Sequence, residues 1–425
     1  MLFYINLGLI IYFLTKKQRR LNNFILTLVI SLFLFSSQDP FFGIPIYFYN
    51  MLISIILCFD GKSSLKNKRN LSLLFLLLII ITLMLFQIFN ICIGENILPS
   101  ILINETSTDY MDITTHLKVP TLNFTIFKHF VFYILYLIFI ICNSDLLNDS
   151  YSLTLCKNKI FKIFKFMFIC IIIEWLIVNL LNGYNDRPIM DFLFNLDSRM
   201  DYNWNFMGYS SVCFWFTERS YIDCILVFYL LLTLSKNKSF NSCFWFIISG
   251  ITVFCVGSST GIFIFLIFLL YFTIEFLLKS NNIFIKFFFI ILDIIIICIV
   301  LSNHDILKKI QDYLFFEESY GSAYFRRQAN NYGLEAIEFS PFLGIGIGTI
   351  YCHSLLIQTI ANIGFLGFMF AIVFHVIAIK KVKFNFNLFI KIFIVALICS
   401  SAYMIQEFTS PYILCIFIPL LSNNL

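Results

Sequence analysis

The chain has 425 residues, of which 60% are hydrophobic and only 12% are charged, and its formal net charge is +5. Soluble globular domains carry roughly 25% charged residues, so this composition excludes a soluble enzyme or a soluble binding module. The cations lie beside the ends of apolar runs, and this distribution argues against a nucleic-acid partner.

Apolar runs recur along the whole chain and predict membrane-spanning helices, because a backbone in hydrocarbon must pair its polar groups within its own segment. The runs lie at residues 1–14, 22–37, 44–59, 71–91, 127–142, 164–182, 219–234, 243–257, 259–278, 283–301, 354–379, 387–403 and 409–422. The predicted fold is therefore an all-α, polytopic integral membrane protein with about 12 to 13 transmembrane helices. No repeat or linker divides it, so we expect a single transmembrane domain over residues 1–425.

The distribution of Lys and Arg between alternate loops predicts the orientation, because cytoplasmic loops are enriched in both residues. One set of loops holds 20 of the 29 basic residues: Lys16, Lys17, Arg19, Arg20, Lys62, Lys66, Lys68, Arg69, Lys157, Lys159, Lys162, Lys165, Lys236, Lys238, Lys279, Lys286, Lys380, Lys381, Lys383 and Lys391. This set is predicted to be cytoplasmic. The opposite side carries about 17 of the 24 acidic residues and the long loops 92–126, 183–218 and 302–353. We expect function on that external side, with an active site formed by the last two loops.

The second long loop contains residues suited to an anionic substrate. Arg187 and Arg199 offer planar guanidinium groups that match phosphate or carboxylate. Glu218 and Arg219 stand where the next apolar run begins. A structural alternative makes Glu218 an acid favoured by a helix N-terminus and Arg219 an interfacial anchor.

The third long loop ends in the most polar stretch that leads into a span. Arg326 and Arg327 open a short helical pattern that ends before Pro341, and Gly344, Gly346 and Gly348 follow. Glycines let backbone N–H groups approach an anion closely and let a loop fold back into a helix bundle. His353 and Ser354 then stand at the mouth of the run at 354–379. Deep in that run, His375 is expected to pack against a neighbouring helix or to bond to it.

Ionisable residues within the apolar runs leave a different class of function open. Glu174 and Asp293 lie inside such runs, where a charge is costly and by default suggests function. They favour an ion-coupled transporter or a flippase as the alternative to an enzyme.

The order of these features resembles the Wzy/WaaL superfamily of bacterial O-antigen polymerases and ligases. The resemblance covers about two-fifths of the chain, from Arg199 to Phe370. It rests on an arginine-bearing helix, a P-x-x-G-x-G segment, a His followed by a polar residue, and a hydrophobic helix with G-x-x-G. Those positions are Arg326 or Arg327, Pro341, Gly344, Gly346, His353, Ser354, Gly364 and Gly367. The chain departs from the pattern at Ser354, where Asn is commoner, and in the turn Ser258–Gly261, which lacks the family's Arg.

The resemblance implies a glycosyltransferase of the bacterial inner (cytoplasmic) membrane that polymerises undecaprenyl-diphosphate-linked oligosaccharide repeat units into O-antigen or capsule. Cations would hold the diphosphate as its charge grows, and a base would take the proton of the acceptor hydroxyl. The candidates for the first task are Arg199, Arg326, Arg327 and Arg219, with Gly344, Gly346, Gly348 and Ser354 as further substrate-binding residues. His353 is the candidate base, and Glu218 is the second candidate.

The expected partners are the lipid-linked oligosaccharide, membrane lipids, and a possible chain-length regulator and flippase. We expect no cofactor and no metal, because the loops lack a carboxylate cluster such as Asp-x-Asp. The 13 cysteines are scattered and no CxxC occurs, which also argues against a zinc site. A ligase that transfers the glycan to lipid A core or protein remains the nearest alternative, because it would use the same site logic.

Overall fold

The fold is known from a computed structural model that describes residues 2–33, 44–59, 68–93, 124–180, 205–206, 209–210, 212, 226, 229, 240–279, 283–302, 322–350, 352, 354–379 and 414. Within these residues the chain is helical, apart from one ladder of two short strands. Its contacts divide it into two compact units. The first contains Met1–Lys162, Phe192–Leu196 and Phe325–Leu425, and the second contains Ile163–Asp191 and Asp197–Tyr324.

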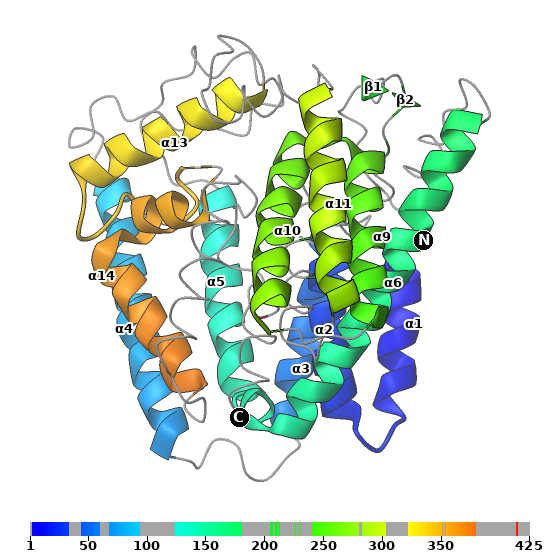
Figure 1. The fold of residues 1–425 in the computed structure, drawn as a ribbon. Coiled ribbons are helices and arrows are strands. Elements are labelled where there is room, and N and C mark those ends of the chain that lie inside the picture. The colour runs from blue at the N-terminus through cyan, green and yellow to red at the C-terminus, as the bar shows by residue number, and fades with distance from the viewer. Residues whose placement is uncertain are drawn as a thin grey trace. The chain divides into compact units, whose positions relative to one another are not determined.

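The first unit is a helix bundle closed by a crosswise helix (Figure 1). Its helices are α1 (Leu2–Leu14), α2 (Arg19–Phe33), α3 (Ile46–Phe59), α4 (Lys68–Ile93), α5 (Phe124–Cys142), the start of α6 (Ser150–Leu180), most of α13 (Ser322–Phe339), and α14 (Leu355–Ala378). Helix α2 packs against α1 and α3, α3 packs against α5, and α4 packs against α5 and α14. Helix α13 ends at Phe339, two residues before Pro341, because the residue that precedes a proline disfavours helical dihedrals.

The second unit contains the rest of α6, α9 (Phe240–Val256), α10 (Ser259–Lys279) and α11 (Ile283–Ser302). The corner between α9 and α10 is built by two adjacent residues. Gly257 takes a left-handed φ of 65° and donates to the Val253 carbonyl (2.9 Å), which closes α9. Ser258 then opens α10, because its hydroxyl accepts the Gly261 N–H at 3.4 Å. The two-residue strands β1 (Asn205–Phe206) and β2 (Tyr209–Ser210) pair antiparallel inside the predicted loop 183–218.

Buried asparagines join the first three helices of the bundle. The amides of Asn6 and Asn50 donate to each other, at 2.7 and 3.0 Å, and so connect α1 with α3. The Asn23 amide of α2 donates to the Asn50 carbonyl at 2.9 Å. All three side chains are at most 2% exposed, and a buried amide without partners would be costly, so these contacts fix the mutual register of the helices.

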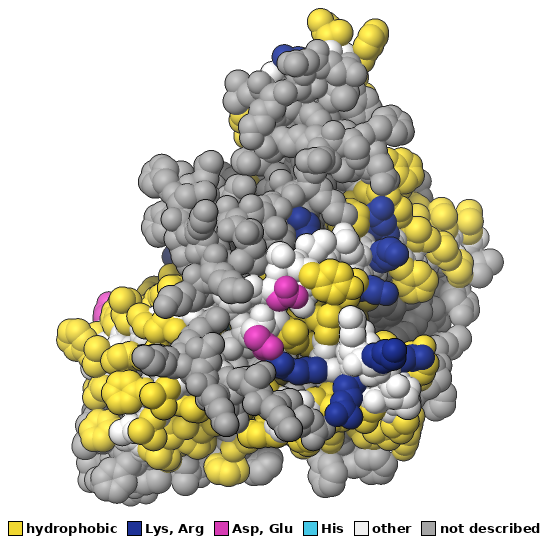
Figure 2. Space-filling view, turned by 90° about the horizontal axis from the view of Figure 1, so that it is seen from below, with side chains coloured by type: hydrophobic (Ala, Val, Ile, Leu, Met, Phe, Trp, Pro, Cys, Tyr) yellow, Lys and Arg dark blue, Asp and Glu magenta, His cyan; other side chains and the backbone are white. Residues whose placement is uncertain are grey.

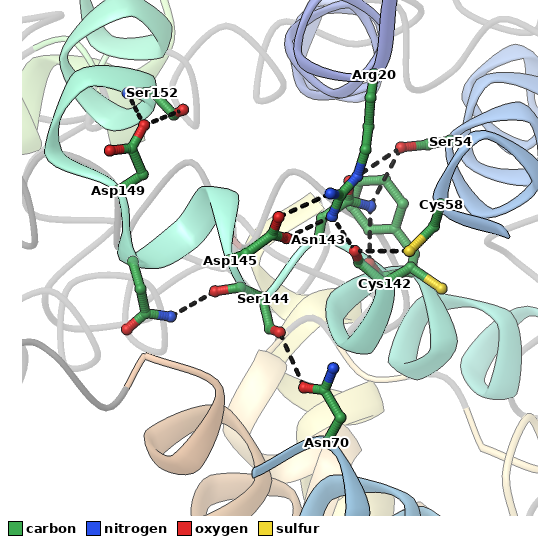
Figure 3. A network of polar contacts seen from close by, with 12 residues as sticks. Arg20, Ser54, Cys58, Asn70, Cys142, Asn143, Ser144, Asp145, Asp149 and Ser152 are labelled. Atoms are coloured by element: carbon green, nitrogen blue, oxygen red, sulfur yellow. Dashed lines mark hydrogen bonds and ion pairs between the residues drawn. The ribbon is translucent and has the colours of Figure 1, made fainter. Parts of the chain in front are cut away.

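One end of the first unit is held by a polar network around Arg20 (Figure 3). At this end α2 and α4 begin, and α3, α5 and α14 end. Arg20 forms a bidentate ion pair with Asp145, with Nη1 2.7 Å from Oδ2, and it also donates to the Cys142 carbonyl. Burial acts to lower the pKa of Arg20, but the hydrogen bond and the charge of Asp145 outweigh it, so the pKa is raised above its ordinary value.

The same network reaches three further helices. Cys58, near the end of α3, donates to the Cys142 carbonyl at 3.2 Å, and Ser144 donates to Asn70 near the start of α4 at 3.3 Å. Asn148 donates to the carbonyl of Ala378, the last residue of α14, at 2.7 Å. We call this end of the unit the basic end, because exposed cations surround the network (Figure 2). Those of the first unit are Lys16, Lys17, Arg19, Lys159 and Lys162.

The predicted helices are confirmed wherever the structure describes their residues. Helices α1, α3, α4, α5, α9, α10, α11 and α14 match the apolar runs within a few residues at each end, and α6 begins earlier than its run. Three helices in the described part are long and apolar enough to cross a membrane: Asn70–Ile88, Ser150–Leu180 and Leu355–Ala378. The described residues are thus helical apart from β1 and β2, and the single-domain organisation stays a prediction.

We expect Arg20→Met to lower the free energy of unfolding by about 1–3 kcal/mol, because the hydrogen bonds from Arg20 to Asp145 and to the Cys142 carbonyl would be lost, and hydrogen bonds to charged groups are worth that much. The melting temperature of the purified chain in detergent measures this effect. Lys17→Met, which replaces an exposed cation three positions earlier, is the matched control and should change little. Equal melting temperatures for the two variants would contradict the structural role of the Arg20 network.

Candidate functional site

Helix α14 is broken at Gly364, and the loop that precedes α14 pairs the backbone groups at the break. Gly364 has φ 69° and ψ 173°, far from helical values, so neighbouring carbonyl and N–H groups lose their partners within the helix. We call residues Ser340–Ile350 the glycine loop. Four backbone bonds connect it to the break: Ile345 N to Ala361 O (2.8 Å), Gly346 N to Asn362 O (2.9 Å), Phe365 N to Pro341 O (2.8 Å) and Leu366 N to Phe342 O (3.1 Å).

The glycines at this junction are required by the close approach of two backbones. Gly344 has φ 70°, and a Cβ on it would lie 2.5 Å from the Gly364 nitrogen. A Cβ on Gly364 would collide with the carbonyl of Phe342. Both positions combine a left-handed backbone with no room for a side chain, so only glycine fits.

Two of the glycines have a structural role in addition to the anion-binding role that the sequence suggests. The Gly344 N–H donates to the Ser340 carbonyl at 2.9 Å, and the Gly346 N–H donates to the Asn362 carbonyl. Both N–H groups thus donate to backbone carbonyls of the protein itself. The sequence predicted correctly that the loop folds back into the bundle, and substrate binding by Gly344, Gly346 and Gly348 stays a prediction.

Three side-chain amides hold the end of the glycine loop and the residues that connect it to α14. The Asn362 amide, in α14, accepts the Ile350 N–H at 3.3 Å and donates to the Ile350 carbonyl at 3.2 Å. Gln358, one turn earlier, accepts the Cys352 N–H at 3.3 Å. Asn330 of α13 accepts the Ser354 N–H at 3.1 Å.

Helix α13 packs closely on this segment. Its Gly333 leaves no room for a side chain, because a Cβ there would meet the Cys352 Sγ and, at 2.5 Å, the Ile357 Cγ2. One buried apolar cluster joins α13, the glycine loop and α14. Its members are Ala336 in α13, Ile345 and Ile350 in the loop, Cys352 after the loop, and Ala361 in α14. Burial raises the pKa of the Cys352 thiol to about 12.

Two residues that sequence reasoning missed complete this end of the unit. Gln87, near the end of α4, donates to the Leu343 carbonyl. His129, in the first turns of α5, lies against the loop, since a Cβ on Gly348 would be 2.9 Å from the His129 Cδ2. Both stand near the ends of apolar runs, and no sequence pattern indicates which loop they contact.

The structure describes only part of the predicted site. Ser354 is 2% exposed and held by Asn330, and Arg327 is exposed on α13 one helical turn before Asn330. Arg326 belongs to α13, but its side chain lies outside the described residues, as do Arg199, Glu218, Arg219 and His353. The structure thus brings together Ser354, the three glycines and the helix that carries the arginine pair.

His375 confirms the prediction of a bond to a neighbouring helix. Its Nδ1 lies 2.7 Å from the Ala371 carbonyl, which can only accept, so Nδ1 carries the proton. Its Nε2 then accepts from the Tyr136 hydroxyl of α5 at 3.1 Å. Glu174 of α6 is 7% exposed in the second unit.

No protein-family model matches the chain, and neither a curated protein nor a solved structure matches it. Among the described residues, no group of three His, Cys, Asp or Glu side chains could hold a metal ion.

Gly364→Ala and Gly344→Ala should each destabilise the chain by at least about 1–3 kcal/mol, because the added Cβ forces apart two backbones and strains a left-handed residue. Gly8→Ala is the matched control, since nothing lies within 4 Å of a Cβ there. As an alanine in a helix interior, it should be neutral or stabilising by about 0.5–1 kcal/mol. Thermal unfolding in detergent compares them. Equal unfolding temperatures for all three variants would contradict the close packing of the glycine loop on the break in α14.

A variant that retains Cys352 as its only cysteine should react slowly with maleimide at pH 8 while folded. Because burial raises the thiol pKa from 9.0 to about 12, the thiolate fraction at that pH falls roughly a thousandfold. The stability linked to this neutral thiol is present below pH 9 and declines as the pH rises toward 12. Labelling rates before and after unfolding in SDS test the prediction, and equal rates would contradict it.

Proposed function

We propose that the chain is a polytopic glycosyltransferase of the bacterial inner membrane that polymerises undecaprenyl-diphosphate-linked oligosaccharide repeat units into a surface polysaccharide. It would cross the membrane about 12 to 13 times, since every apolar run of suitable length is counted as a span. The observation that carries the proposal is the break in α14, where backbone hydrogen bonds hold the glycine loop and, with it, the segment that leads to Ser354.

The arrangement of helix ends supports a membrane-spanning bundle with two chemically different faces. The Arg20 network joins the starts of α2 and α4 with the end of α14. The Lys and Arg distribution assigns all three to the cytoplasm. The end of α4 and the start of α5, which it assigns to the outside, meet at the glycine loop. The cytoplasmic and external faces predicted from the sequence thus correspond to opposite ends of the first unit.

The position of α13 supports a site for an anionic lipid carrier. Figure 1 shows this helix lying crosswise at the end of the first unit where α4 ends and α5 begins, the end that the Lys and Arg distribution assigns to the outside. The helix carries Arg, Gln, Asn and Glu residues, and Arg327 is exposed on it. Guanidinium groups at this level would meet a diphosphate whose lipid tail remains in the bilayer. The apolar helices below would contact that tail.

The proposed reaction transfers the growing glycan from its carrier to a new repeat unit. A hydroxyl oxygen of the acceptor sugar attacks the anomeric carbon of the donor, and the bond from that carbon to the diphosphate oxygen breaks. The bonding electrons leave with the diphosphate, whose growing charge Arg326, Arg327 and Arg199 would stabilise, with Arg219 as a further candidate. The hydroxyl proton passes to His353, or to Glu218 as the second candidate base.

His353→Ala should abolish long polysaccharide chains while leaving the amount of membrane-inserted protein unchanged, because the acceptor hydroxyl would lose its base. In cells whose own copy is deleted, the variant and the wild type are compared by gel electrophoresis of the surface polysaccharide. His116→Ala, in the first external loop, is the control and should restore normal chains.

The deletion strain separates the alternatives. A product with a single repeat unit supports a polymerase. Loss of all glycan from the lipid A core would indicate a ligase instead, and intermediates held on the cytoplasmic leaflet would indicate a flippase. Normal chain length in the His353→Ala variant would remove His353 from the mechanism.

A further inference from the structure

Three amide side chains hold the peptide backbone on both sides of the candidate base. Their acceptor oxygens bind the N–H groups of Ile350, Cys352 and Ser354, at 3.3, 3.3 and 3.1 Å. A backbone N–H can only donate, so each amide must present its oxygen, and its orientation is fixed. His353 is the residue between Cys352 and Ser354 in the sequence.

Asn330 differs from the other two because it comes from a different element. Gln358 and Asn362 belong to α14, which directly follows the segment that they hold. Asn330 belongs to α13 and is 24 residues from Ser354, the residue it binds. It stands three positions after Arg327, so the two residues are neighbours on one side of the helix.

The Asn330 bond therefore connects two parts of the proposed site. One end is the helix that carries the arginines, and the other is the backbone next to the candidate base. Asn330 is 8% exposed and Ser354 is 2% exposed, so water does not readily replace the bond. Loss of the acceptor would leave a buried N–H without its partner, and the segment would shift to satisfy it.

We propose that Asn330, assisted by Gln358 and Asn362, is a positioning residue that sets the distance between the diphosphate-binding arginines and the base. This inference rests on the proposed glycosyl transfer and adds the device that aligns its two halves. A displacement of about 1 Å between reacting groups can cost on the order of a hundredfold in rate. Loss of one hydrogen bond at this junction can therefore lower the reaction rate strongly.

The test compares three variants of the full chain in proteoliposomes, with undecaprenyl-diphosphate-linked single repeat units from the deletion strain as substrate. Asn330→Leu keeps the volume of the side chain and removes the acceptor. Asn330→Asp retains an oxygen for the Ser354 N–H. Asn331→Leu makes the same exchange at the next, exposed position and is the matched control.

We expect Asn330→Leu to lower kcat by about 10- to 100-fold with little change in KM, because the substrate still binds but the base is misplaced. Asn330→Asp should recover most of kcat, and Asn331→Leu should match the wild type. Amide hydrogen exchange of the purified chain gives the structural readout. The peptide that contains Ser354 should exchange faster in Asn330→Leu alone.

Two results would overturn the inference: an unchanged exchange rate in Asn330→Leu, or faster exchange with wild-type kcat. If Asn330→Leu did not fold, Gln358→Leu against Gln358→Glu would make the same comparison at Cys352. A failure of the proposed function looks different, because His353→Ala would then form normal polymer. In that case the exchange data would still decide whether the bond exists, and its catalytic role would fall with the function.

Discussion

The rest of this site depends on one constraint: the backbone groups at the break in α14 have no partners within the helix and must be paired by another segment. A helix interrupted inside an apolar bundle leaves carbonyl and N–H groups that hydrocarbon cannot satisfy. The glycine loop supplies their partners, and it can do so only where two backbones touch without side chains, at Gly344 and Gly364. Irregular backbone inside a helix bundle is tolerated where surrounding protein supplies its hydrogen-bond partners. The same packing fixes the segment that leads to Ser354.

The opposite end of the first unit is organised by charge. Arg20 connects the start of α2 to the turn after α5 through Asp145. The Cys58 thiol, the Ser144 hydroxyl and the Asn148 amide connect α3, α4 and α14 to the same turn. Arg20 is partly buried but Asp145 is exposed, so water screens the ion pair and the pair alone contributes little stability. Here Arg20 also donates to the Cys142 carbonyl at the end of α5. The first unit is thus held at one end by the polar network around Arg20 and at the other by backbone hydrogen bonds between the glycine loop and α14.

Between these ends, single polar residues specify the packing of apolar helices. The reciprocal amides of Asn6 and Asn50, and the Tyr136–His375 bond, each pair two helices that would otherwise present similar apolar faces. Such pairs exclude other registers, because sliding either helix would bury an unsatisfied group. The same logic holds at the proposed active site, where amide side chains act as partners for isolated backbone N–H groups.

The amino-acid sequence predicts the described helices, the end of α13 before Pro341, and the gathering of Lys and Arg on one side of the bundle. These properties are local, because a backbone in an apolar run pairs with itself within four residues. It also indicated that the glycines fold the loop back into the bundle, through their lack of a Cβ. Which groups the glycines meet follows from the packing of the helices. The partners of Arg20 and Gln87 lie 125 and 256 residues away, and Asn330 finds Ser354 across 24 residues. No periodicity records such pairings, because they depend on how whole helices pack rather than on any one residue's neighbours in the chain.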